Sequence, residues 1–251
     1  MTKNSLYLLK WYAFSAGLGG LVLIGTIAAV RRGDYTPVIG LAIGLVFLCL
    51  SVLHFRRKTR LLFRNPTPDY AIAQYHNSWK RIPDGKAMAA YLSAFAAVLY
   101  GEYGRAREEL AAVNWERCPP MYQGFESYVH SLLAIFQLRD YSKALLLAEE
   151  ARDLCAVEGR FPGATKSSVA LSSHVAVCRF LLGDVDRQIL TQIETAARQT
   201  SGVSPAIPAW ALAAYYTSEG RPEDAEEYLA IVNRLVPYGA ALQDSHIRAR
   251  R

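Results

Sequence analysis

Two long apolar segments without acidic or basic residues constrain the fold of this chain more than any other feature. Residues 11–30 and residues 35–55 contain 20 and 21 residues, and their one histidine is His54. A helix needs about 20 mostly apolar residues to cross the hydrocarbon core of a bilayer. The sequence therefore predicts an all-α protein whose residues 1–64 form a transmembrane hairpin with a basic juxtamembrane segment.

The distribution of Lys and Arg predicts how this hairpin is oriented. Lys3 and Lys10 precede the first segment, and the turn between the segments offers only Arg31 and Arg32, partly offset by Asp34. Cytoplasmic flanks of membrane spans are enriched in Lys and Arg. We therefore expect an integral protein of a bacterial-type inner (cytoplasmic) membrane, with both termini in the cytoplasm.

A basic cluster follows the second segment in the sequence RRKTRLLFR, residues 56–64. This stretch is predicted to continue the second helix into the headgroup region. Each cation there attracts anionic lipid by about 1 kcal/mol, although a plain stop-transfer flank has the same charges. The predicted lipid contacts are Arg56, Arg57, Lys58, Arg60 and Arg64.

Small residues at four-residue spacing, such as Gly40 and Gly44, recur in both apolar segments. This spacing lets helices approach closely in lipid, either within one hairpin or between copies of the chain. Packing within the hairpin explains the pattern more simply, and self-association remains the alternative.

The remainder of the chain offers little support for nucleic-acid binding or catalysis. Residues 1–86 carry +9 and residues 87–251 carry −3, which together give the net charge of +6. A nucleic-acid-binding domain needs a basic face, and the sequence contains no motif for catalysis, a cofactor or a metal. His174 and Cys178 lie four residues apart, which indicates a buried structural pair more than a nucleophile and its base.

Helical periodicity extends through the rest of the chain, interrupted by four similar turns. Residues 65–86 are predicted to form a linker and one extra helix. The turns lie at 101–103, 139–141, 183–185 and 220–222, spaced by 38, 44 and 37 residues. The residues three positions after the end of each turn are Ala106, Ala144, Gln188 and Ala225, so Gln188 is the exception to a small residue.

This pattern resembles the tetratricopeptide repeat over residues 87–237, although that repeat has about 34 residues. The best copies contain RDYSKALLLAEEA and SEGRPEDAEEYL. The resemblance implies stacked helix pairs, an α-solenoid, with residues 238–251 as a capping helix or tail. It also implies a concave groove for a protein partner, unless the same side chains fill the core. The implied lining is Tyr91, Phe95, Val98, Val129, Leu133, Phe136, Val177, Phe180 and Trp210.

Together these features predict a non-catalytic, membrane-anchored adaptor or scaffold. Its repeat domain would bind or organise a protein partner at the cytoplasmic face of the membrane, without a cofactor. Two alternatives are a structural homo-oligomer with no separate client and an enzyme with an unrecognised site.

Overall fold

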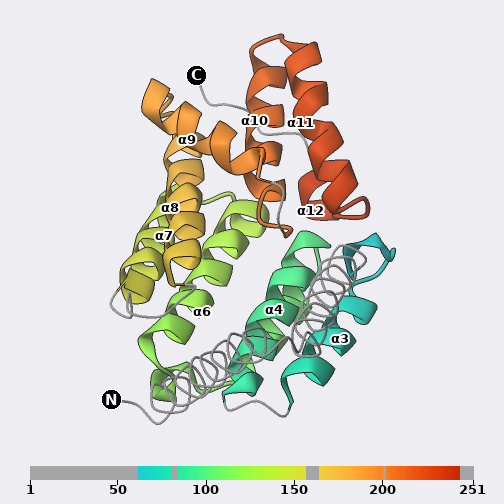
Figure 1. Ribbon diagram of the computed structural model, residues 1–251, viewed down its shortest axis with the longest axis vertical. Coiled ribbons are helices and arrows are strands. Elements are labelled where there is room, and N and C mark those ends of the chain that lie inside the picture. Colours follow the sequence, from blue (N-terminus) through green and yellow to red (C-terminus); the bar gives the residue numbers. More distant parts are fainter. Residues whose placement is uncertain (1–61, 81–83, 157–163, 200–201, 244–251) are drawn as a thin grey trace, which may run out of the picture. The chain divides into compact units, whose positions relative to one another are not determined.

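The structure of the protein is a computed structural model, which describes residues 62–80, 84–156, 164–199 and 202–243 (Figure 1). The chain divides into two compact units, Met1–Lys58 and Thr59–Arg251, and every described residue belongs to the second. The predicted hairpin at residues 11–30 and 35–55 therefore lies outside the described residues, as do Arg56, Arg57, Lys58 and Arg60. Among the residues that are described, no helix is long and apolar enough to cross a membrane.

The described part of the chain is helical and contains no β-strand, as the sequence predicts. The α-helices are α3 (Asp69–Trp79), α4 (Gly85–Leu99), α5 (Tyr103–Ala111), α6 (Pro120–Leu133), α7 (Tyr141–Ala156), α8 (Ala164–Leu181), α9 (Arg187–Ala197), α10 (Ala206–Ser218), α11 (Pro222–Leu235) and α12 (Ala240–Gln243). Short 3₁₀ turns η1 (Leu62–Arg64) and η2 (Trp115–Arg117) and a π-helical turn η3 (Ala134–Leu138) complete them.

The four predicted turns lie where the first helix of each pair ends. Gly101, Arg139, Gly183 and Gly220 all have left-handed backbone conformations, with φ of 79°, 58°, 98° and 71°. In three of the turns the next amide donates to the carbonyl five residues earlier, which is the Schellman pattern. These bonds run from Glu102 to Ala97, from Asp184 to Arg179 and from Arg221 to Tyr216.

The second turn differs because it contains one additional residue. There the amide of Asp140 donates to the carbonyl of Ala134, six residues earlier, at 3.0 Å. The π-helical turn η3 accommodates this residue and places Arg139 where the other turns have glycine.

The two helices of each pair pack side by side. The pairs α4–α5, α6–α7 and α10–α11 are in close contact, and α4 also contacts α6 while α8 contacts α10. Figure 1 shows α10 and α11 running antiparallel from the turn that joins them. The small residues Ala106, Ala144 and Ala225 are buried at the start of the second helix of these three pairs, as predicted.

The start of the described chain belongs to the core of the helical unit. Leu62 and Phe63 are buried, and the Phe63 ring stacks on Tyr100 with 6.3 Å between centroids. The Tyr100 hydroxyl donates to the carbonyl of Asn65 at 2.7 Å, while Arg64 is exposed. This differs from the predicted continuation of a juxtamembrane helix to residue 64, because two large apolar side chains gain more from the protein core than from an interface.

Candidate functional site

Helix α9 departs from the packing of the other second helices. Helix α9 has Gln188, Gln192 and Thr195 at the positions that are wholly or partly buried in α5, α7 and α11. All three residues are exposed. The buried residues are instead Ile193, Ala196 and Ala197. One residue corresponds to a rotation of about 100° around a helix axis. Helix α9 therefore buries a neighbouring face and exposes a polar one.

The exposed face of α9 and the first half of α8 together line an open groove of about 800 Å³. This volume lies within the range of about 300–1,000 Å³ that is usual for ligand pockets. Helix α8 contributes Val169, Ser172 and Ser173, and the remaining lining comes from α9 and the residues that flank it. We call this feature the α8–α9 groove.

Seven of the eleven residues that line the groove have uncharged polar side chains. The Thr191 hydroxyl donates to the Arg187 carbonyl at 2.8 Å, and the Thr195 hydroxyl donates to the Thr191 carbonyl at 2.7 Å. Within the described residues, the side-chain amides of Gln188 and Gln192 make no hydrogen bond. The groove thus offers amides that can both donate to and accept from an occupant.

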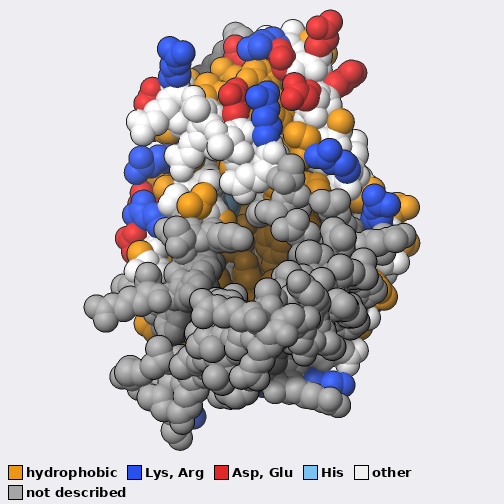
Figure 2. Space-filling model, viewed as in Figure 1, with side chains coloured by type: hydrophobic (Ala, Val, Ile, Leu, Met, Phe, Trp, Pro, Cys, Tyr) orange, Lys and Arg blue, Asp and Glu red, His pale blue; other side chains and the backbone are white. Residues whose placement is uncertain are grey.

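Charged groups around the groove are few and mixed in sign. Asp186 and Arg187 are the ionic residues of its lining. In Figure 2 the surface over α9 is largely white, the colour of uncharged polar side chains and backbone, whereas red and blue side chains gather near the turn between α10 and α11. This arrangement favours recognition by hydrogen bonds over recognition by net charge.

A buried polar cluster joins α6, α7 and α8 behind this groove. The Ser131 hydroxyl donates to the carbonyl of Ala144 at 2.7 Å and lies 2.9 Å from Nε2 of His174. Cys178 Sγ lies 3.8 Å from both Ser131 Oγ and His174 Nε2. A serine hydroxyl has one proton. Since the Ala144 carbonyl can only accept, Ser131 must accept from an Nε2–H group of His174.

This hydrogen bonding determines the tautomer of His174. With the proton on Nε2, the neutral ring has a bare lone pair on Nδ1. His174 is 4% exposed, and its Nδ1 has no hydrogen-bond partner among the described residues. A buried acceptor without a hydrogen-bond partner lowers the stability of the fold by about 1–3 kcal/mol.

Burial also keeps His174 and Cys178 neutral. Desolvation lowers the pKa of His174 to about 3 and raises the pKa of the Cys178 thiol to about 12. A nucleophilic cysteine needs its thiolate, usually beside a protonated histidine. The geometry thus favours the structural interpretation of this pair over the nucleophilic one.

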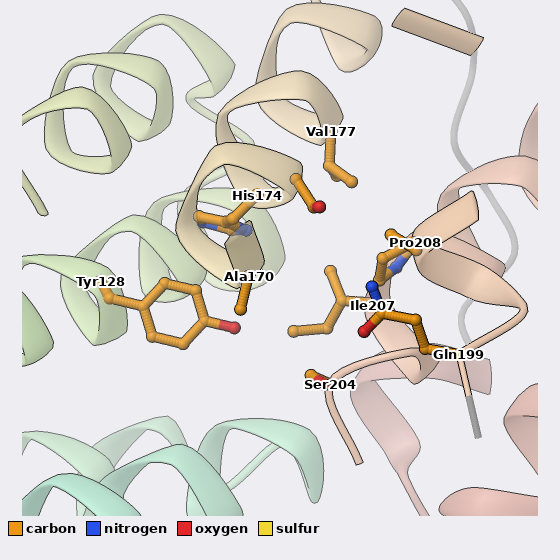
Figure 3. Close-up of a pocket in the computed structure, with 10 residues that line it drawn as sticks. Tyr128, Ala170, His174, Val177, Gln199, Ser204, Ile207 and Pro208 are labelled. Carbon is orange, nitrogen blue, oxygen red and sulfur yellow. The ribbon is translucent and has the colours of Figure 1, made fainter. Parts of the chain in front are cut away.

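A small pocket adjoins the groove and ends at the buried cluster. Its volume is about 30 Å³, and it shares Ser173, Ala196 and Gln199 with the α8–α9 groove. Figure 3 shows Tyr128 reaching from α6 with its hydroxyl toward Ala170 and Ile207, while His174 lies on α8 above them. The Tyr128 and His174 rings meet edge to face at 4.6 Å between centroids.

None of the nine predicted groove residues lines the α8–α9 groove, although Val177 lines the small pocket beside it. Eight of them are buried in the helical core, and Tyr91 is partly buried against it. They form aromatic contacts there, such as Phe136 with Trp210 at 4.7 Å and Phe95 with Tyr128 at 6.1 Å between centroids. These positions therefore correspond to the core alternative raised by the sequence.

Sequence reasoning missed the exposed face of α9, although a signal was present. Ile189, Ile193 and Ala196 recur at helical spacing one residue after the positions aligned with the other repeats. That shift could have identified the buried face. The Ser131–His174 contact spans 43 residues and had no comparable signal.

No known protein family, curated protein or solved structure matches this chain. Among the described residues, no group of three or more His, Cys, Asp or Glu side chains could hold a metal ion.

Proposed function

We propose that the protein is a membrane-anchored adaptor that binds an extended segment of a partner protein in the α8–α9 groove. The observation that carries this proposal is the exposed polar face of α9. The equivalent positions of the second helices α5, α7 and α11 are wholly or partly buried, whereas Gln188, Gln192 and Thr195 face the groove. An exposed row of amides and hydroxyls matches the donors and acceptors of an extended peptide backbone.

Two features of the helical unit support a repeat scaffold of the tetratricopeptide type. The first helix of each pair ends in a left-handed turn at the predicted position. The first helices α4 and α6 contact each other, as do α8 and α10, which is how repeats stack side by side. Such scaffolds bind peptides on extended surfaces between neighbouring helices.

Membrane anchorage is the second part of the proposal and rests on the sequence. Residues 11–30 and 35–55 are each long enough to span a bilayer and contain no Asp, Glu, Lys or Arg. We place both termini in the cytoplasm because the cations of residues 56–64 outnumber those at 31–34. A cytoplasmic reporter fused after Arg251 should be active. Activity of a periplasmic reporter there would instead reverse this orientation.

The binding role can be tested by comparing partners recovered from detergent-solubilised membranes. The groove variant is Gln188→Ala with Gln192→Ala, and the control is Glu223→Ala with Glu226→Ala on the exposed face of α11. We expect a protein that is recovered in stoichiometric amount with the wild type and the control and is depleted with the groove variant. Recovery of this chain alone, at several expression levels, would contradict the adaptor and favour the structural homo-oligomer.

A further inference from the structure

Elements η1 and α12, the first and last of the described chain, both lie at the end of helix α4. The Phe63 ring of η1 stacks on Tyr100, whose hydroxyl donates to the carbonyl of Asn65. Helix α12 packs on α4 (Figure 1), and a Cβ added at Gly239 would lie 3.2 Å from the Leu99 carbonyl oxygen. The chain therefore enters and leaves the helical unit at one place. We call this surface, which comprises residues 64–70, 99–102 and 237–240, the α4 end.

Two exposed tyrosines lie on the α4 end. Tyr70, in the first turn of α3, is 42% exposed, and Tyr238, in the loop before α12, is 48% exposed. No other aromatic side chain in the described ranges is as exposed. Burial and, secondly, the nearby Tyr238 raise the pKa of Tyr100 to about 12, so Tyr238 lies near the Tyr100 hydroxyl. Tyrosine is enriched where a bilayer meets water, because its ring is apolar and its hydroxyl is polar.

Cations outnumber carboxylates on and beside the α4 end. Asp69 and Glu102 both bind Arg105, with N–O distances of 2.7 and 3.3 Å. Arg64 is exposed, as is Arg234 in the last turn of α11. Neither of these two arginines forms an ion pair with a described residue. Their guanidinium groups are therefore available to an anionic partner.

The segments that continue the chain from the α4 end are strongly basic. Residues 56–61 join it to the second apolar segment, and four of these six residues are Lys or Arg. A linker of six residues reaches roughly 20 Å when fully extended. Residues 244–251 follow α12 and contain three arginines against one aspartate. Basic segments thus adjoin this surface in the chain before and after it, and the short linker keeps the surface near the bilayer that would hold the anchor.

We propose that the α4 end is a second membrane contact of the protein, which binds the headgroups of anionic phospholipids together with the basic residues 248–251. This inference rests on the membrane anchorage proposed above. It goes further by assigning a lipid surface as a partner of the helical unit itself. The arginines attract the phosphate groups, and the rings of Tyr70 and Tyr238 enter the interfacial layer.

The test uses the full-length protein in nanodiscs of phosphatidylcholine, either alone or mixed with phosphatidylglycerol. The photoreactive amino acid p-benzoylphenylalanine replaces Tyr238, or Glu226 on the exposed face of α11 as a control, and lipid adducts are quantified by mass spectrometry. We expect adducts from position 238 in the mixed nanodiscs. In pure phosphatidylcholine they should be at least about fivefold fewer, because the attraction of one cation to anionic lipid contributes about this factor. Position 226 should give no adduct in either lipid.

Two charge variants test the part played by the basic residues after α12. Arg250→Gln with Arg251→Gln should lower the adduct from position 238 in mixed nanodiscs by at least about fivefold. The matched control, Lys86→Gln with Arg117→Gln, removes two exposed cations outside the α4 end and should leave the adduct unchanged.

Adduct yields that are equal in the two lipids, or that Arg250→Gln with Arg251→Gln leaves unchanged, would overturn this inference while the anchor stands, because the protein is retained in the nanodiscs. Crosslinks from position 238 only to a second copy of this chain would also overturn it and would identify a self-association surface. A protein that enters neither kind of nanodisc would contradict the proposed anchorage and this inference together.

Discussion

Individual residues determine the turns of the helical unit through their backbone conformation. Gly220 ends α10 with φ of 71°, and a Cβ there would meet no heavy atom within 4 Å. Any penalty for a side chain at this position thus comes from the left-handed conformation and not from a clash. Gly104 offers a matched comparison, because it lies within α5 and has the same open surroundings.

We predict that Gly220→Ala lowers the free energy of unfolding of the full-length protein by about 1 kcal/mol, the penalty for an L-residue with positive φ. Gly104→Ala should raise it by less than about 0.5 kcal/mol, since alanine is favoured over glycine in a helix but Gly104 is only the second residue of α5. Urea denaturation followed by circular dichroism measures both. Equal effects of the two substitutions would show that the left-handed turn is not the reason for Gly220.

The buried imidazole of His174 makes stability depend on pH. Its pKa is lowered to about 3 in the folded protein, because burial disfavours the charged ring. The unfolded chain takes up this proton near pH 6.5, whereas the folded protein does not, so stability is lost as pH falls below that value. Burial raises the pKa values of the neighbouring Tyr128 and Cys178, which therefore remain neutral in this window.

Between pH 7 and pH 5, the wild type should lose about 2 kcal/mol of its free energy of unfolding because of His174. We predict that the His174→Gln variant does not show this loss. The absolute stability of the variant will differ, and the pH slope is the quantity to compare. Between pH 7 and pH 8 the two proteins should keep a constant difference in free energy of unfolding. A variant with the wild-type slope below pH 7 would contradict a buried, neutral His174.

At the scale of elements, the orientation of α9 distinguishes the α8–α9 pair from the other three helix pairs. Ile193 is fully buried, whereas the adjacent Gln192 is exposed in the groove. Alignment with the other pairs would place the Gln192 position inside. The two orientations therefore predict opposite outcomes for substitutions at neighbouring residues.

We predict that Ile193→Ala lowers the free energy of unfolding by about 2–4 kcal/mol, as for other large-to-small substitutions in cores. Gln192→Ala should change it by less than about 0.5 kcal/mol, as is usual at the surface. The reverse order in a urea denaturation series would place the other face of α9 in the core.

The sequence predicts some elements well because their causes are local. The turns at Gly101, Gly183 and Gly220 follow from a residue that adopts positive φ easily. The buried alanines after the first and last of them, Ala106 and Ala225, follow from close helix approach. Arg139 shows the limit of this reasoning. The left-handed turn at Arg139 forms because the π-helical turn η3 before it accommodates one additional residue. The residue types in this segment do not predict that insertion.

The candidate site could be predicted only in part because its contacts are long-range. The pair His174 and Cys178 is apparent as an i, i+4 spacing, but Ser131 joins it across two helices. The predicted aromatic groove residues lie in the core because large apolar side chains gain more from burial than from solvent exposure. Gln188, which replaces the small residue of the other pairs, is exposed and lies on the open surface of α9.

At the scale of the molecule, the proposal joins a membrane anchor to a helical unit with one open polar groove. In this proposal, the cations of residues 56–64 orient the anchor, and the α8–α9 groove determines what is recruited. The charge of −3 over residues 87–251 makes a nucleic acid a poor candidate for that occupant. A protein segment recognised through its backbone is consistent with the amides of the groove.

Site-specific photocrosslinking in intact membranes tests this claim most directly. A photoreactive amino acid at Gln192, within the groove, is compared with one at Glu226, an exposed site on α11. We predict a discrete crosslinked band of one partner protein from position 192, absent from position 226. Crosslinks equal at both positions, or only to a second copy of this chain, would contradict a partner-binding groove.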